Sequence, residues 1–63
     1  MKLRFFISEY SDGNLNVECK HMHYAFRNDL NFDDIPPDDL LKTMRTITET
    51  LQKENIIATF QIL

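Results

Sequence analysis

Two stretches near the start of the chain alternate apolar with polar residues and predict β-strands. The first covers residues 2–10, with apolar positions at Leu3, Phe5 and Ile7. The second runs from Leu15 to about Phe26, with apolar positions at Leu15, Val17 and Cys19, and later at Met22, Tyr24 and Phe26. Between them, residues 11–14 hold the only glycine of the chain in a sequence typical of turns. The pattern therefore predicts a β-hairpin.

The turn between these strands decides which residues share a face of the sheet. A two-residue loop at 12–13 would place apolar residues opposite charged ones. A type I turn with Gly13 as a left-handed bulge residue makes a three-residue loop instead. The pairs in that register are Glu9 with Leu15, Ile7 with Val17, and Phe5 with Cys19. We predict this bulged hairpin, because it gathers the apolar residues of both strands on one buried face.

Residues 37–54 have the periodicity of one amphipathic helix of about five turns. Its apolar stripe consists of Leu40, Met44, Ile47 and Leu51. Pro37 suits the first helical position, and Asp38 and Asp39 place negative charge at the positive end of the helix dipole. Asn55 is expected to end the helix in the left-handed conformation.

Residues 56–63 alternate again and predict a third strand, which gives the element order ββαβ. We predict an α+β fold of two layers, in which the helix covers one face of a three-stranded, mainly antiparallel sheet. Pairing of the last strand with the first gives the order 2-1-3, and pairing with the second strand is the alternative. Residues 27–36 are interpreted as a connection that Leu30, Phe32 and Ile35 hold against the core.

Composition narrows the class of protein. A chain of 63 residues with 43% hydrophobic residues predicts one small globular domain over 1–63, with a thin core. The single cysteine, Cys19, excludes an internal disulfide and fits a reducing compartment, so we expect a cytoplasmic protein. No apolar run approaches the roughly 18 residues of a membrane span, and we expect neither a signal peptide nor a membrane partner.

The net charge of −3 is unevenly distributed along the chain. Residues 28–39 hold five aspartates and no base, whereas residues 1–27 carry four bases and three acids. The negative net charge favours solubility and counts against non-specific binding of nucleic acid. The acidic segment 29–39 is expected to steer docking to a basic partner, or to imitate nucleic-acid charge in the manner of a small inhibitor.

No motif in the chain predicts catalysis or a cofactor. One glycine cannot form a phosphate-binding glycine loop, and a domain of this size offers little cleft to exclude water. Cys19, His21 and His23 would lie on one side of a continuous strand and are the candidate zinc ligands. Residues two apart on a strand are about 6.6 Å apart, which is wide for ligands of one ion, and a fourth ligand is not evident. We therefore expect a protein that is not an enzyme and holds no metal or cofactor.

The predicted register leaves a second sheet face that is too apolar for ordinary solvent exposure. It combines bases with aromatic and apolar residues, namely Lys2, Arg4, Phe6, Tyr10, Lys20, Met22 and Tyr24. One interpretation is a bend near Lys20 that turns Met22, Tyr24 and Phe26 into the core. The other is a contact surface for a second copy or for a partner.

The main functional prediction is a small acidic protein-interaction module, either a homodimer or a regulator or inhibitor of another protein. It would bind through the outer sheet face, an edge strand and the acidic segment 29–39. The expected contact residues are Phe6, Tyr10, Met22, Tyr24, Asp29, Asp33 and Asp34.

The alternative is the binding of single-stranded nucleic acid on the outer sheet face, with bases stacked on aromatic rings and phosphates held by basic side chains. The residues for this function are Lys2, Arg4, Phe6, Lys20 and Tyr24. The net charge and Glu18 on the same face count against it.

Overall fold

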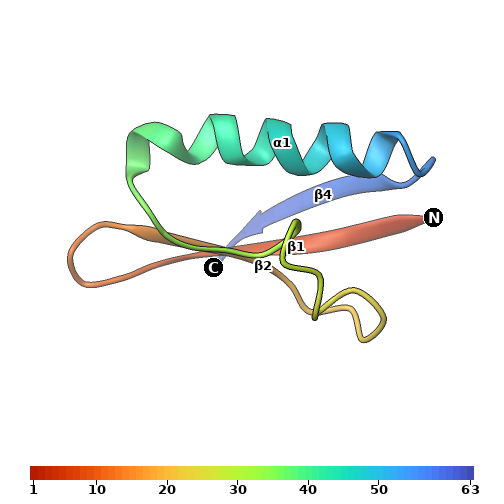
Figure 1. Ribbon diagram of the computed structural model, residues 1–63. Helices are drawn as coiled ribbons and strands as arrows, with labels where there is room; N and C mark the ends of the chain where they lie inside the picture. The colour runs from red at the N-terminus through yellow and green to blue at the C-terminus, as the bar shows by residue number, and fades with distance from the viewer.

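The computed structural model describes all 63 residues. Its elements in chain order are β1 (Lys2–Glu9), β2 (Leu15–Cys19), β3 (Phe32–Ile35), the 3-10 turn η1 (Pro37–Asp39), α1 (Leu40–Gln52) and β4 (Ile57–Ile62). Helix α1 packs along one face of a four-stranded sheet, and no helix covers the other face (Figure 1). The predicted α+β fold with one helix is confirmed. The helix is too short and too polar to cross a membrane.

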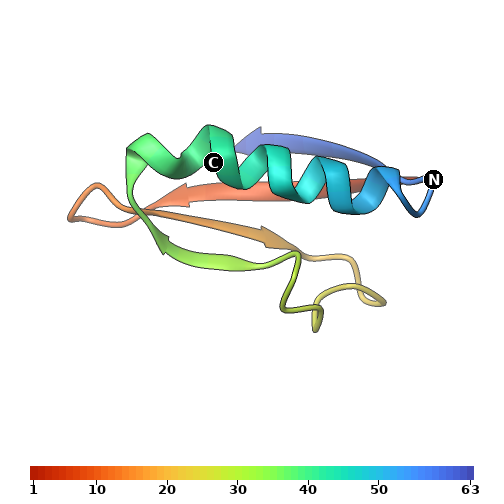
Figure 2. The same cartoon turned by 45° about the horizontal axis from the view of Figure 1, so that its top comes forward.

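The sheet has the strand order β3-β2-β1-β4 (Figure 2) and thus one strand more than predicted. β1 and β2 pair in the predicted bulged register, with Ile7 opposite Val17. Gly13 has a φ of 90°, as the bulge residue requires. β4 lies beside β1, as predicted, but runs parallel to it. The sheet is therefore mixed: two of its strand pairs are antiparallel and the β1–β4 pair is parallel, so the predicted count of three strands and the predicted direction of the last strand are wrong.

The direction of β4 follows from β3, which the sequence pattern did not predict. β3 pairs antiparallel with β2 and adds one reversal of the chain before α1, so the helix returns the chain parallel to β1. Leu15 and Val17 lie two positions apart on β2, but their β3 partners lie three positions apart. The extra residue is a β-bulge with Asp34 at a φ of 54°. Because a bulge breaks the period of two, this stretch predicts a connection and not a strand.

The second strand is shorter than predicted, because β2 ends at Cys19 and does not continue to Phe26. Residues 20–31 instead form consecutive turns. These turns are closed by backbone hydrogen bonds from Tyr24 to His21 (2.9 Å), from Arg27 to Tyr24 (3.1 Å) and from Leu30 to Arg27 (3.2 Å). Much of the segment projects to the side of the sheet away from α1 (Figure 1, yellow). The segment therefore borders the outer sheet face at one end.

Neither interpretation of the apolar residues after Lys20 holds for all of them. Met22 and Phe26 are 77% and 92% exposed in the turns, so they belong neither to the core nor to the sheet face. Tyr24 is half-buried and packs against the core. The positions predicted for Met22 and Tyr24 on the outer sheet face are wrong, because the strand ends before them.

The core lies between α1 and the inner face of the sheet. Its nine buried apolar residues are Leu3, Phe5, Ile7, Val17, Cys19, Leu30, Ile35, Ile47 and Leu51. The predicted helical stripe contributes the last two, with Leu40 and Met44 half-buried at its margin. Thr43 is also buried, and its hydroxyl donates to the Asp39 carbonyl at 2.9 Å. This bond satisfies a polar group that would otherwise destabilise the core.

The helix predicted over 37–54 is observed as η1 followed by α1, which ends two residues earlier than predicted, at Gln52. Pro37 occupies its first turn, and Pro36 before it supplies no side-chain cap. Asn55 has a φ of 61°, which confirms it as the left-handed stop. The Ile56 amide donates to the Leu51 carbonyl at 3.0 Å, as at many helix ends of this type.

Candidate functional site

β4 is an edge strand whose backbone is paired on one side only. The Ile57 amide donates to the Met1 carbonyl at 3.0 Å, and the Leu63 amide donates to the Ile7 carbonyl at 2.9 Å. Alternate residues of a strand direct their backbone groups to the same neighbour, so the odd-numbered residues of 57–63 face β1. The residues between them direct N–H and C=O groups to the open side, and these are Ala58, Phe60 and Ile62.

Exposed apolar side chains border this open edge. Ile62 is 76% exposed and Leu63 is 68% exposed. β4 contains no charged residue and no proline. An edge strand with these properties presents unpaired backbone groups next to an apolar surface.

One flank of α1 extends this apolar surface. The helix runs antiparallel to β4, so its first turns lie near the end of that strand (Figure 1). Lys42 and Thr46 line a small hollow together with β3. Since successive residues of an α-helix are about 100° apart, the flank with Leu41 and Met44 lies on the opposite side and faces β4. Leu41 is 74% exposed.

The acidic residues at the opposite edge of the sheet have hydrogen-bond partners within the chain. The Tyr10 hydroxyl donates to Asp33, and the Asn14 amide group donates to Asp34 at 2.8 Å. These bonds attach β3 to the turn between β1 and β2. The hydrogen bond to Asp33, with the burial and negative charge around it, raises the pKa of Tyr10 above its ordinary value.

Asp29 belongs to a second cluster, which is centred on Arg27. The Arg27 guanidinium donates to Asp29 at 2.7 and 3.1 Å and to both carboxylate oxygens of Glu54 at 2.8 Å. These charge-assisted bonds lower the pKa of both carboxyl groups. The cluster joins the turns at 20–31 to the end of the helix. Contact between these acidic residues and a partner protein stays a prediction.

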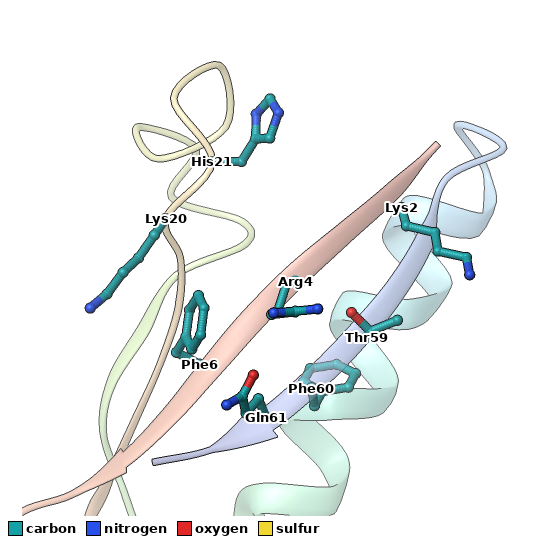
Figure 3. Close-up of a pocket in the computed structure, with 8 residues that line it drawn as sticks. All are labelled: Lys2, Arg4, Phe6, Lys20, His21, Thr59, Phe60 and Gln61. Atoms are coloured by element: carbon teal, nitrogen blue, oxygen red, sulfur yellow. The ribbon is translucent and has the colours of Figure 1, made fainter.

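A concavity of about 700 Å³ lies on the outer sheet face, opposite the helix (Figure 3). The eight residues that line it are Lys2, Arg4, Phe6, Lys20, His21, Thr59, Phe60 and Gln61. Three of them are basic and none is acidic. The concavity is therefore a locally positive surface on a chain of net negative charge.

Arg4 and Phe6 lie at the centre of this concavity (Figure 3). The Lys20 ammonium group lies 5.5 Å from the centroid of the Phe6 ring, within the range of a cation–π interaction. The same ammonium group is 3.7 Å from the Glu18 carboxylate. Lys2 and Arg4 form no ion pair, so their charges are free to interact with an anion.

Four of the five residues predicted for nucleic-acid binding line the concavity, and the exception is Tyr24. Its hydroxyl donates to the Met1 sulfur at 3.6 Å. Its ring packs edge-on against His21, with centroids 5.5 Å apart. His21 lines the concavity without having been predicted there, because its place depends on the turn that follows Cys19.

The candidate zinc ligands do not share a site. Cys19 is a buried free thiol, and its backbone amide donates to the Asn31 side chain at 2.9 Å. His21 and His23 are exposed in the turns, with ring centroids 5.7 Å apart. The structure brings no three histidine, cysteine, aspartate or glutamate side chains together in a geometry suited to a metal ion. The strand that would align these residues ends at Cys19.

Comparisons with known protein families, curated proteins and solved structures gave no significant match. The open edge of β4 and the basic concavity are therefore interpreted from their geometry and charge.

Proposed function

We propose that this protein is a non-enzymatic protein-interaction module that self-associates through the open edge of β4. The observation that carries the proposal is the row of outward-directed N–H and C=O groups at Ala58, Phe60 and Ile62, in a strand with no charge and no proline. Unpaired edges of this kind are templates for pairing with another chain. Main-chain hydrogen bonds then supply affinity, and alternate side chains supply specificity.

A second copy of the chain fits this edge with two-fold symmetry. When two β4 strands pair antiparallel about Phe60, each Phe60 lies opposite its counterpart, and Ala58 lies opposite Ile62 of the partner subunit. These are the residues whose backbone groups are directed outward, so each pair exchanges two hydrogen bonds. The interface is self-complementary and closed, and two sheets become one continuous sheet.

The side chains beside the edge support the same arrangement. The helix flank with Leu41 and Met44 lies next to β4, so pairing of the strands brings the corresponding flanks of two helices together. Leu41 and Ile62, which are both more than 70% exposed in the single chain, become covered. Full burial of one such side chain contributes about 1.5–3 kcal/mol. A domain with so thin a core gains stability from a second subunit.

The same edge also suits an extended segment of another protein. In that case the module acts as a regulator or inhibitor, and the acidic segment 29–39 steers the approach of a basic partner. We infer a cytoplasmic location from the free thiol of Cys19, because unpaired cysteines are typical of reducing compartments.

The variant Ile62→Lys tests self-association. Ile62 is 76% exposed, so a lysine at this position leaves the core intact but adds charge to the edge, which opposes strand pairing. We expect dimerisation to weaken at least tenfold, or about 1.4 kcal/mol, when it is measured by sedimentation equilibrium.

The matched control is Met22→Lys. Met22 is 77% exposed in the turns after β2 and lies outside the proposed interface, so the same chemical change should leave dimerisation unaltered. Equal weakening by both variants, or no weakening by Ile62→Lys, contradicts the proposed edge. Circular dichroism of each variant establishes that the fold is retained.

A further inference from the structure

The basic concavity on the outer sheet face has the chemistry of a nucleic-acid site. We propose that it binds single-stranded RNA or DNA, with one base stacked on Phe6 and neighbouring phosphates held by Lys2, Arg4 and Lys20. This inference goes beyond self-association and does not depend on it, because the outer face and the β4 edge are different surfaces of the sheet.

The charge distribution is the first argument. The chain has ten acidic residues, and none of them lines the concavity. Glu18, which lies opposite Phe6 in the strand register, forms an ion pair with Lys20. The net charge of −3 therefore does not describe the local electric field, which is what an approaching phosphate group meets. Lys2 and Arg4 are basic residues of this surface that have no acidic partner.

The aromatic ring is the second argument. Phe6 is only half-buried on a sheet face that no helix covers, and it lies beside Arg4 at the centre of the concavity (Figure 3). Sheet-based binders of single strands use such a ring as a stacking platform, which strengthens binding by a factor of about 5 to 150 per base. A volume near 700 Å³ is within the range of about 300–1,000 Å³ that ligand sites occupy.

The combination of ring and charge favours a single strand over other anionic partners. In a duplex the bases are stacked on each other, and their faces are not available to Phe6. An acidic peptide supplies charge but no planar ring for stacking. A single strand supplies both an unstacked base and its adjoining phosphates.

Fluorescence anisotropy with labelled oligo-U and oligo-dT strands tests this proposal. Binding should weaken with salt, and the logarithm of the association constant should fall with the logarithm of salt concentration with a slope of about −2, from three phosphate contacts at about −0.7 each. Arg4→Gln should weaken binding and make the slope shallower by about 0.7. Phe6→Leu should weaken binding about 5- to 150-fold and leave the slope unchanged, because the ring carries no charge.

Two control variants remove a base and a ring elsewhere. Arg45→Gln acts on α1, which covers the other sheet face, and Phe26→Leu removes a ring that is 92% exposed in the turns. Neither should change affinity by more than about twofold, a factor worth roughly 0.4 kcal/mol. Circular dichroism verifies that every variant is folded. Since Arg4 is exposed, Arg4→Gln tests the site even where Phe6→Leu impairs folding.

Several outcomes overturn the proposal. One is the absence of binding by either strand at low salt. Another is binding that Arg4→Gln and Arg45→Gln reduce equally. A third is binding of heparin or polyglutamate as tightly as the single strands, with no effect of Phe6→Leu on a folded protein, which indicates a general polyanion or acidic-peptide surface. A monomeric protein that binds the strands as described contradicts self-association but leaves this site intact.

Discussion

β3 and β4 form the two edges of the same sheet, but only β3 carries features that prevent another strand from pairing with it. β3 has four residues, two of them aspartates, and is followed directly by Pro36. Its bulge at Asp34 interrupts the regular row of backbone groups. β4 has six residues with no charge, no bulge and no proline. Short length, charge, bulges and proline are the devices by which proteins block a strand edge.

The β3 edge therefore carries residues that oppose association with another strand, whereas the β4 edge does not. Hydrogen bonds from Tyr10 and Asn14 hold the β3 edge against the hairpin turn. The β4 edge has no corresponding attachment on its open side, and exposed Ile62 lies beside it. We interpret this asymmetry as the reason why one edge of a small sheet is closed and the other is available to a partner.

The largest expected effect comes from breaking the protected edge with Ile35→Ala. Ile35 is 6% exposed and anchors β3 to the core. The loss of a buried isoleucine costs about 2–5 kcal/mol. A domain of 63 residues has a total stability of about 3–9 kcal/mol, at 0.05–0.15 kcal/mol per residue. Urea denaturation should therefore show a strongly destabilised or partly unfolded protein.

The control for this prediction is Ile62→Ala at the other edge. Ile62 is 76% exposed, so in the monomer its truncation should change the free energy of unfolding by no more than about 0.5 kcal/mol. Measurement at a protein concentration below dimerisation separates this effect from loss of the interface. Similar costs at both edges contradict the view that β3 is anchored and β4 is open.

A smaller effect is expected from alkaline pH, which acts on the attachment of β3. The pKa of Tyr10 is raised in the folded state, chiefly by its hydrogen bond to Asp33. A raised pKa means that this contact stabilises the fold below the ordinary value of about 10 and ceases to do so as pH rises through the folded-state value. Ultraviolet titration of tyrosinate should show Tyr10 ionising at lower pH in Asp33→Asn than in the unmodified chain. Identical titration curves contradict the contact.

The parts of the fold that local signals determine were predicted correctly. Gly13 indicated the bulged hairpin, Pro37 indicated the helix start, and Asn55 indicated its end, because each residue type favours one backbone conformation where it stands. β3 was not predicted, because the bulge at Asp34 removes the alternation on which strand prediction depends. The parallel direction of β4 was not predicted for the same reason, because omitting β3 reverses the predicted direction of β4 relative to β1.

The candidate site was predicted only where its residues lie on a strand that the sequence pattern identifies. Arg4 and Phe6 were expected on the outer face, because their place follows from the register of β1. Tyr24 was expected in the site but packs against the core, whereas His21 lines the concavity without having been predicted there. Both differences arise because the turn after Cys19 has no strong sequence signal. An edge strand was predicted as a binding element, but which edge is open depends on pairing between strands far apart in the chain.

The two proposed surfaces are compatible within one assembly. Pairing of two β4 edges leaves the outer sheet face free, and a two-fold axis perpendicular to the sheet places both concavities on the same side. Thr59 and Gln61, which line each concavity, would then lie on the side of it that faces the paired β4 strands. Loss of one surface by mutation should leave the other functional.

The most direct test of the open edge is the mass of the unmodified protein in solution as a function of its concentration. Sedimentation equilibrium over about 1 μM to 1 mM covers the range in which a modest interface associates. A reductant prevents the Cys19 thiol from contributing a covalent link. Association through β4 predicts a mass that rises from 7.5 kDa to twice that value and no further, because the interface is closed. A constant mass of 7.5 kDa across the whole range contradicts it.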